Sequence, residues 1–262
     1  MIDANFYMHE DDKKALDALK SFPGFTAIIK GFFNNWNERQ ARILFMSSYI
    51  KASPTQFSKY YEMLPPICKK LGIEIPDLYI SQDVVPNAFT TGDEHPSVVL
   101  TSGLLKALPE YLIPTVLAHE CGHIACKHVL YRTVGASILA GTYLFGLGRL
   151  MSLPLQVAFY YWMRCSEYSA DRAAIICDGG SEKLNELCIR LSGYDKAIDA
   201  DVSPEEFRNQ GLAYRKYIKE SKWNQTLEFL LLHNRTHPFM AVRALEATEW
   251  ANSIQFKAMM GK

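Results

Sequence analysis

A helical segment with two closely spaced histidines constrains this chain more than any other feature. His119, Glu120 and His123 form an H-E-x-x-H pattern within residues 115–131, where the neighbouring residues favour a helix with an apolar face. Positions i and i+4 lie on one face of a helix, so both imidazoles can reach a single ion. Glu120 lies about 100° round the same helix and can reach a water bound to that ion. The pattern is typical of zinc that keeps an open position beside a carboxylate base.

A third ligand is needed, because the short pattern also occurs by chance on ordinary surface helices. Residues 164–175 predict a second helix, on which Glu167 and Asp171 again lie four positions apart. Glu167 can complete a His-His-Glu site, and Asp171 can accept a hydrogen bond from a ligand histidine and fix its tautomer. The alternative is a solvated acidic face, with these carboxylates paired to Arg164 or Arg172.

The composition excludes several classes of function and suggests a compartment. The chain has a formal net charge of zero and no basic run, so nucleic acid is not expected as a main partner. No two cysteines form a C-x-x-C pair, which argues against a disulfide framework or a cysteine-based zinc module. Reduced thiols beside the proposed ligands and the absence of a secretory signal predict a cytoplasmic protein. The cysteines are Cys68, Cys121, Cys126, Cys165, Cys177 and Cys188.

Local patterns predict an α+β fold that is mainly helical. Residues 1–72 are interpreted as an N-terminal helical segment that packs on the core, and residues 73–262 as the domain that carries the site. Runs at 73–80, 84–89 and 97–101 have the alternating or extended character of strands. They predict a small sheet just before the motif helix, and the rest of the chain is expected to be helical.

Residues 133–163 allow two interpretations. They are apolar and carry a single charge, Arg149. The uncharged runs on either side are only about 13 to 16 residues long, short of the roughly 20 that span a bilayer. A buried or interfacial helical hairpin and a membrane hairpin both stay open, so peripheral or hairpin membrane contact through this segment is an expectation to test. The sequence predicts no oligomeric state.

Five short stretches, in order along the chain, form a combined signature. They are Asn-Ala-Phe at 87–89, Val-Val-Leu-Thr-Ser-Gly-Leu-Leu at 98–105, Leu-Ala-His-Glu-Cys-Gly-His at 117–123, Ser-Glu-Tyr-Ser-Ala-Asp-Arg-Ala-Ala at 166–174, and Thr-His-Pro at 236–238 with Arg243 further on. This signature resembles the HtpX-like and CaaX prenyl-protein endopeptidase family of zinc metallopeptidases, which are gluzincins. The resemblance implies a zincin-like fold with a small sheet before the active-site helix. Membrane members of that family carry longer spanning segments than residues 133–163 offer.

The resemblance also implies an activity and a set of residues for it. The chain would be a zinc-dependent endopeptidase that hydrolyses peptide bonds of unfolded or membrane-associated polypeptides. His119, His123 and Glu167 would bind Zn²⁺, and Glu120 would be the general base for a zinc-activated water. Asp171 would orient a ligand histidine from behind. The expected partner is the polypeptide substrate.

Other residues have a suggested role and a structural alternative. His237 is a candidate donor to the oxyanion, or else a structural histidine at a helix start. Asn87 and the strand around Val98 and Leu100 could hold the substrate as an added β-strand, while Asn87 could equally order a turn. His128 follows the motif by five residues, where a ligand role would compete with the third ligand. We therefore expect it behind the site or at the surface.

Two functions compete at this point. The first is the endopeptidase described above. The second is a binding or chaperone-like protein at the membrane surface that keeps the zinc fold but hydrolyses little. All the catalytic residue types are present, which favours the first.

Overall fold

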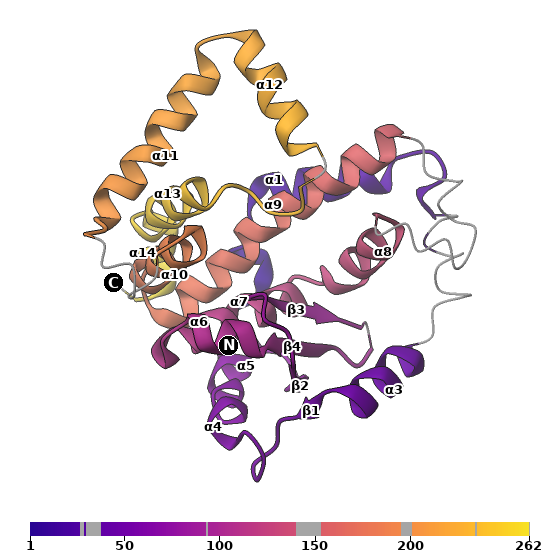
Figure 1. Ribbon diagram of the computed structural model, residues 1–262. Helices are drawn as coiled ribbons and strands as arrows, with labels where there is room; N and C mark the ends of the chain where they lie inside the picture. The colour runs from indigo at the N-terminus through magenta and orange to yellow at the C-terminus, as the bar shows by residue number, and fades with distance from the viewer. Residues whose placement is uncertain are drawn as a thin grey trace.

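The motif helix, α7, lies between a small β-sheet and the long helix α9 (Figure 1). The computed structural model describes residues 1–26, 29, 38–92, 94–139, 153–194, 201–233 and 235–261. The helices in this part are α1 (Glu10–Lys20), α3 (Glu38–Ser48), α4 (Ser58–Tyr61), α5 (Leu64–Leu71), α6 (Ser102–Ala107), α7 (Ile113–Ala125), α8 (Val129–Leu139), α9 (Leu153–Asp178), α10 (Glu182–Ser192), α11 (Pro204–Lys219), α12 (Lys222–Leu232), α13 (Met240–Ala251) and α14 (Ile254–Met259), with 3-10 turns at Ala4–Phe6 and Glu110–Leu112.

The sheet has four strands in the order β1-β2-β4-β3. They are β1 (Ile50–Lys51), β2 (Asp77–Ser81), β3 (Ala88–Thr91) and β4 (Ser97–Thr101). β2 and β4 pair in parallel, while β1 and β3 pair antiparallel to them at the two edges. Every residue of β4 is buried, as expected of a strand that is covered on both faces. Thr101 ends β4 and starts α6, because its Oγ1 accepts a hydrogen bond from the Leu104 backbone N–H at 3.1 Å.

The predicted fold class is confirmed: the described residues are mainly helical, and the small sheet precedes the motif helix. The N-terminal segment contributes more than helices, since β1 adds an edge strand to that sheet. This strand has two residues, which is too short for any period-2 pattern to reveal it. Residues before 72 also reach the site helices, because α1 packs on α9 and α5 packs on α7.

A glycine inside the motif lets α7 and α9 cross at close range. A Cβ built on Gly122 would lie 2.7 Å from the Cβ of Ala173 and 3.0 Å from the Cα of Ala170, both on α9. Real side-chain carbons do not approach this closely, so only glycine fits at this crossing. Because the two alanines are also small, the backbones lie near enough for side chains from both helices to meet beside the crossing.

The expected hairpin at 133–163 is described only in part, because its centre, residues 140–152, lies outside the described residues. The two helices that lead into it, α8 and the start of α9, share an apolar cluster with α1. Leu155, Phe159 and Trp162 are fully or almost fully buried in that cluster. No helix in the described ranges is both long enough and apolar enough to cross a membrane.

The close crossing makes Gly122→Ala a test of the fold around the site. Alanine favours a helix interior over glycine by about 1 kcal/mol, but here its methyl group would push α9 away from α7. We expect a lower melting temperature and weaker metal binding, measured by thermal unfolding with and without added metal.

Gly135→Ala on α8 is the matched control. The nearest atoms to its added Cβ are side-chain atoms of Phe159 and Met163, at 3.1 and 3.4 Å, and no backbone atom lies as near. We expect a smaller change in that variant than in Gly122→Ala. Metal binding of wild-type strength in Gly122→Ala would show that the close crossing is not required.

Candidate metal centre

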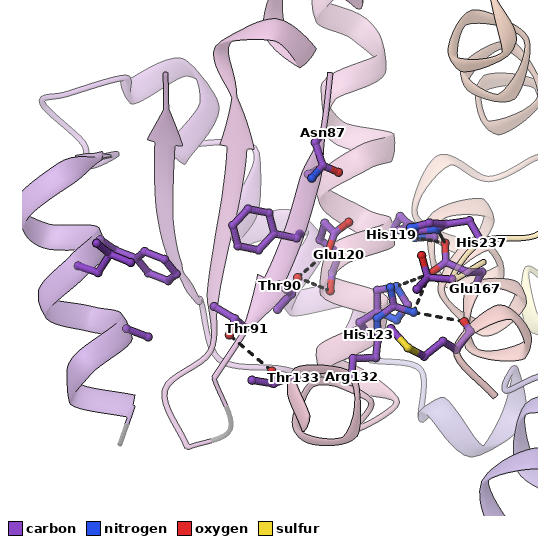
Figure 2. A pocket seen from close by; sticks show the side chains of 17 residues that line it. Asn87, Thr90, Thr91, His119, Glu120, His123, Arg132, Thr133, Glu167 and His237 are labelled. Atoms are coloured by element: carbon purple, nitrogen blue, oxygen red, sulfur yellow. Dashed lines mark hydrogen bonds and ion pairs between the residues drawn. The ribbon is translucent and has the colours of Figure 1, made fainter. Parts of the chain in front are cut away.

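Three potential ligands meet beside the crossing of α7 and α9. Nε2 of His119 lies 3.4 Å from Oε2 of Glu167, and Nε2 of His123 lies 3.4 Å from Oε1 of the same carboxylate. One donor atom from each residue lies within 4.8 Å of the other two, and all three side chains are buried. The structure therefore brings together the three residues that the sequence suggested as ligands (Figure 2). Two imidazole nitrogens and one carboxylate oxygen are a donor set that fits a divalent catalytic metal.

His119, the first candidate ligand, is oriented by a buried ion pair behind it. Nδ1 of His119 lies 2.9 Å from Oδ1 of Asp171, one turn beyond Glu167 on α9. Arg243 of α13 holds that aspartate from the other side, since its Nη2 and Nε donate to the two carboxylate oxygens at 2.6 and 2.9 Å. Burial opposes a charge on Asp171, but Arg243 and His119 outweigh it and hold the pKa of that carboxyl below its usual value. Asp171 thus stands where the sequence suggested, behind a ligand.

The electrostatics of the site favour a positive charge at the ligands. Burial disfavours the charged form of His119, yet its hydrogen bonds to Asp171 and Glu167 prevail and raise the pKa of His119 to about 9. Two ionised carboxylates next to one buried ring would equally attract a metal cation. A cation in this position would take the place of the proton on His119, so metal and proton compete for the ring.

Two cationic or polar side chains hold the third ligand. Nη1 of Arg132 lies 2.8 Å from Oε1 of Glu167, and Nδ1 of His237 lies 2.7 Å from Oε2. Burial alone would raise the pKa of Glu167, but His237 and Arg132 hold it well below its usual value. Arg132 was missed by the sequence analysis. The available signal is that it is the lone charge in the apolar run from 129 to 148, where a buried counter-ion is to be expected.

The side chain of Glu120 points toward the β-sheet. Its Oε2 accepts a hydrogen bond of 2.7 Å from the hydroxyl of Thr90 on the edge strand β3 (Figure 2). This contact anchors the carboxylate at the wall of a cavity, next to His119 and His123. Thr90 was also missed, because nothing in a β-strand pattern marks one threonine as the neighbour of a residue on a distant helix.

A cavity of about 540 Å³ opens in front of the ligands. Glu120, the three ligands and His237 line one part of it, and β3 lines another together with Asn87 just before it. α3 adds an apolar wall, made by Ala41, Leu44 and Phe45. The side chain of His237 is about half exposed at the opening. The cavity therefore joins the candidate metal ligands, the candidate base and the edge strand of the sheet in one space.

The placement of β4 corrects part of the substrate-binding expectation. Val98 and Leu100 are completely buried, and their strand is paired on both sides, with β2 and with β3. A strand without a free edge cannot take an added substrate strand, and these side chains face the core. The edge next to the cavity is β3. Asn87 stays near the cavity, where its backbone N–H donates to Oγ1 of Thr101 at 2.9 Å.

His128 lies outside the group of candidate ligands and is not at the surface. It is fully buried, and its Nδ1 lies 3.1 Å from Nδ1 of His123, on the side of that ring away from Glu167. The sequence suggested that His128 lies behind the site or at the surface, and in the structure it lies behind the site.

Comparison with known proteins agrees with this geometry. A model of Peptidase family M48 matches residues 54–251, which include the motif helix, the third ligand and His237. The chain belongs to peptidase family M48. The HtpX-like resemblance noted in the sequence is confirmed, and the chain is a metallopeptidase with a metal cofactor.

Named relatives of this metallopeptidase come from a plant and from bacteria. The plastoglobule-localized metallopeptidase 48, chloroplastic, of Arabidopsis thaliana is 26% identical over 270 residues, covering 99% of this chain and 76% of that protein. A protease HtpX homolog of Campylobacter concisus is 43% identical over 215 residues, covering 71% and 72%. A protease HtpX homolog of Ralstonia pickettii is 26% identical, covering 66% and 68%. No solved structure matches the chain.

Asp171→Asn tests the support behind the first ligand. An amide cannot balance the buried Arg243 charge, and breaking such a pair typically costs about 3–5 kcal/mol of stability. Loss of a group that orients a ligand histidine weakens metal binding by roughly 10- to 100-fold. Competition with a chromophoric chelator measures the loss of metal affinity.

Asp178→Asn is the matched control for this variant. Asp178 ends the same helix but accepts from the hydroxyl of Thr115 at 2.7 Å, away from the ligands. We expect its metal affinity to equal that of the wild type. Unchanged affinity in Asp171→Asn would mean that His119 needs no support from this carboxylate.

Proposed function

We propose that this M48 metallopeptidase is a zinc-dependent endopeptidase that hydrolyses peptide bonds of unfolded or membrane-associated polypeptides. The observation that carries the proposal is the convergence of His119, His123 and Glu167 at one wall of the cavity, with Glu120 beside them. A two-histidine, one-glutamate donor set is the one that zinc takes in hydrolytic enzymes of the H-E-x-x-H type.

The chain's own residues supply the proton transfers of the reaction. Zinc, when bound, supplies Lewis-acid chemistry: it acidifies a water and stabilises negative charge on the carbonyl oxygen of the substrate. Glu120 then takes a proton from the attacking water and passes it to the nitrogen of the leaving amine. The hydroxyl of Thr90 donates to one oxygen of Glu120, which restrains the carboxylate at the cavity wall and leaves its other oxygen for the water.

His237 is our candidate for a second group that stabilises the oxyanion. Its ring stands at the opening of the cavity, and its Nδ1 is held by Glu167 at 2.7 Å. If Nδ1 carries the hydrogen in that contact, Nε2 can donate to an oxyanion only when the ring is doubly protonated. The proposal therefore assigns to His237 an electrostatic role toward the substrate.

The shape of the site supports an extended polypeptide as substrate. β3 is an edge strand with one side unpaired by the described strands, and this strand borders the cavity at Ala88–Thr91. An extended segment can pair with such an edge through backbone hydrogen bonds that any sequence provides. A folded protein rarely offers a free extended segment, so unfolded chains fit best. Asn87, just before β3, is our candidate for a contact with one end of the segment.

Glu120→Gln separates catalysis from metal binding. The amide keeps the size of the side chain but cannot accept the proton of the attacking water, and proton transfer of this kind contributes about 10²- to 10⁴-fold. We expect cleavage of unfolded casein to fall by at least about 100-fold, while metal analysis finds zinc bound as in the wild type. Glu110→Gln, at the exposed 3-10 turn before α7, should retain full activity.

Removal of the metal provides a second test. Treatment with a chelator should abolish cleavage by the wild type, and zinc added back should restore it. A zinc-loaded wild type that cleaves no unfolded protein or peptide library would contradict the proposal and favour a binding function. Full activity of the metal-free protein would contradict it as well.

A further inference from the structure

A line of buried polar side chains connects the second ligand to the N-terminal helix. Nδ1 of His123 lies 3.1 Å from Nδ1 of His128, and Nε2 of His128 lies 2.8 Å from Oδ2 of Asp12 on α1. Asp12 and His128 are fully buried, and His123 is almost so. α1 runs alongside α9, which brings a residue near the start of the chain behind the metal ligands (Figure 1).

The order of protons along this line follows from the contacts. His123 faces Glu167 with Nε2, so a metal there would take the lone pair of Nε2 and leave the hydrogen on Nδ1. That hydrogen can be accepted only if Nδ1 of His128 carries a lone pair. A neutral His128 must then carry its hydrogen on Nε2, which lies 2.8 Å from Oδ2 of Asp12. This contact does not have the angle of a hydrogen bond, but Nε2 has no hydrogen-bond partner elsewhere among the described residues, so Asp12 is its nearest acceptor.

Asp12 is itself held firmly enough to impose this arrangement. The indole Nε1 of Trp162 donates to Oδ1 at 3.0 Å, and the hydroxyl of Ser169 donates to Oδ2. Both donors come from α9, the helix that also carries Glu167. Burial opposes the charge of Asp12, and these two donors compensate for the lost hydration of the carboxylate. An ionised, immobile carboxylate accepts hydrogens and cannot donate one.

We propose that Asp12 and His128 are positioning residues of the metal centre: Asp12 fixes the tautomer of His128, and His128 fixes the ring of His123 with its Nε2 lone pair toward the metal. Both ring nitrogens of His128 are occupied in this way, which explains why it is not a fourth ligand. Asp12 lies outside the residues 54–251 that match the family model, so the proposal gives the N-terminal helix α1 a role in the metal centre. This inference depends on the proposed role of His123 as a ligand.

The test is zinc affinity of the full-length protein, measured by competition with a chromophoric chelator. Asp12→Asn presents an NH₂ group either to the His128 hydrogen or to the indole N–H of Trp162, so it cannot satisfy both. His128→Leu removes the acceptor for His123. We expect zinc affinity to fall by roughly 10- to 100-fold in each variant. Asp17→Asn, the same change at an exposed position of α1, should bind zinc like the wild type.

A second readout separates positioning from packing. If these residues only stabilise the fold, melting temperatures with and without zinc fall together and the zinc-induced increase stays the same. If they position the ligand, the zinc-induced increase shrinks. Trp162→Phe puts a smaller ring at a fully buried position and frees one oxygen of Asp12. It should lower both melting temperatures through lost packing and also show a smaller loss of the same sign in the zinc-induced increase.

The outcomes distinguish this inference from the proposed function. Wild-type zinc affinity in Asp12→Asn and His128→Leu, in a protein that does bind zinc, would overturn the positioning role and leave the peptidase proposal intact. A wild type that binds no zinc would overturn both. An unchanged zinc-induced melting shift in Trp162→Phe together with unchanged affinity would also count against it.

Discussion

The close crossing of α7 and α9 is the constraint on which the site depends. Gly122 sits inside the metal-binding motif and faces Ala170 and Ala173, so the motif itself removes the side chain that would separate the helices. Two histidines on one helix supply only two of the donors, and the crossing brings Glu167 of α9 next to them as a third. The same contact therefore determines both the packing of the core and the geometry of the donors.

Around that crossing the protein buries several charges and balances each of them. Asp171 is paired with Arg243, Glu167 with Arg132, and Asp12 contacts His128. Buried charges are tolerated only when partners and hydrogen bonds compensate for lost hydration. Replacing a buried ion pair with hydrophobic residues of similar size often leaves the stability of a protein unchanged or raises it. The arrangement is better understood as preorganisation, in which rings and carboxylates are already aligned for a cation and for a substrate.

The parts of the site that the sequence could predict are those set by local spacing. His119, Glu120 and His123 follow from one helical turn, and Glu167 was suggested by a second helix of the same period. The assignment of substrate contacts to β4 was wrong, because strand order depends on tertiary pairing: the strand nearest the motif helix in sequence became a central strand, and β3 took the edge. The contact between His128 and Asp12 was out of reach for a similar reason, since it joins segments that share no local pattern.

The ion pair of Arg243 with Asp171 also has a consequence for how the enzyme comes into being. Arg243 belongs to α13, one of the last helices of the chain, while every ligand that it supports lies much earlier. When a polypeptide still emerging from the ribosome folds this motif, Asp171 lacks the partner that compensates for its burial. The support behind His119 is therefore complete only once α13 has been synthesised and has packed on α9.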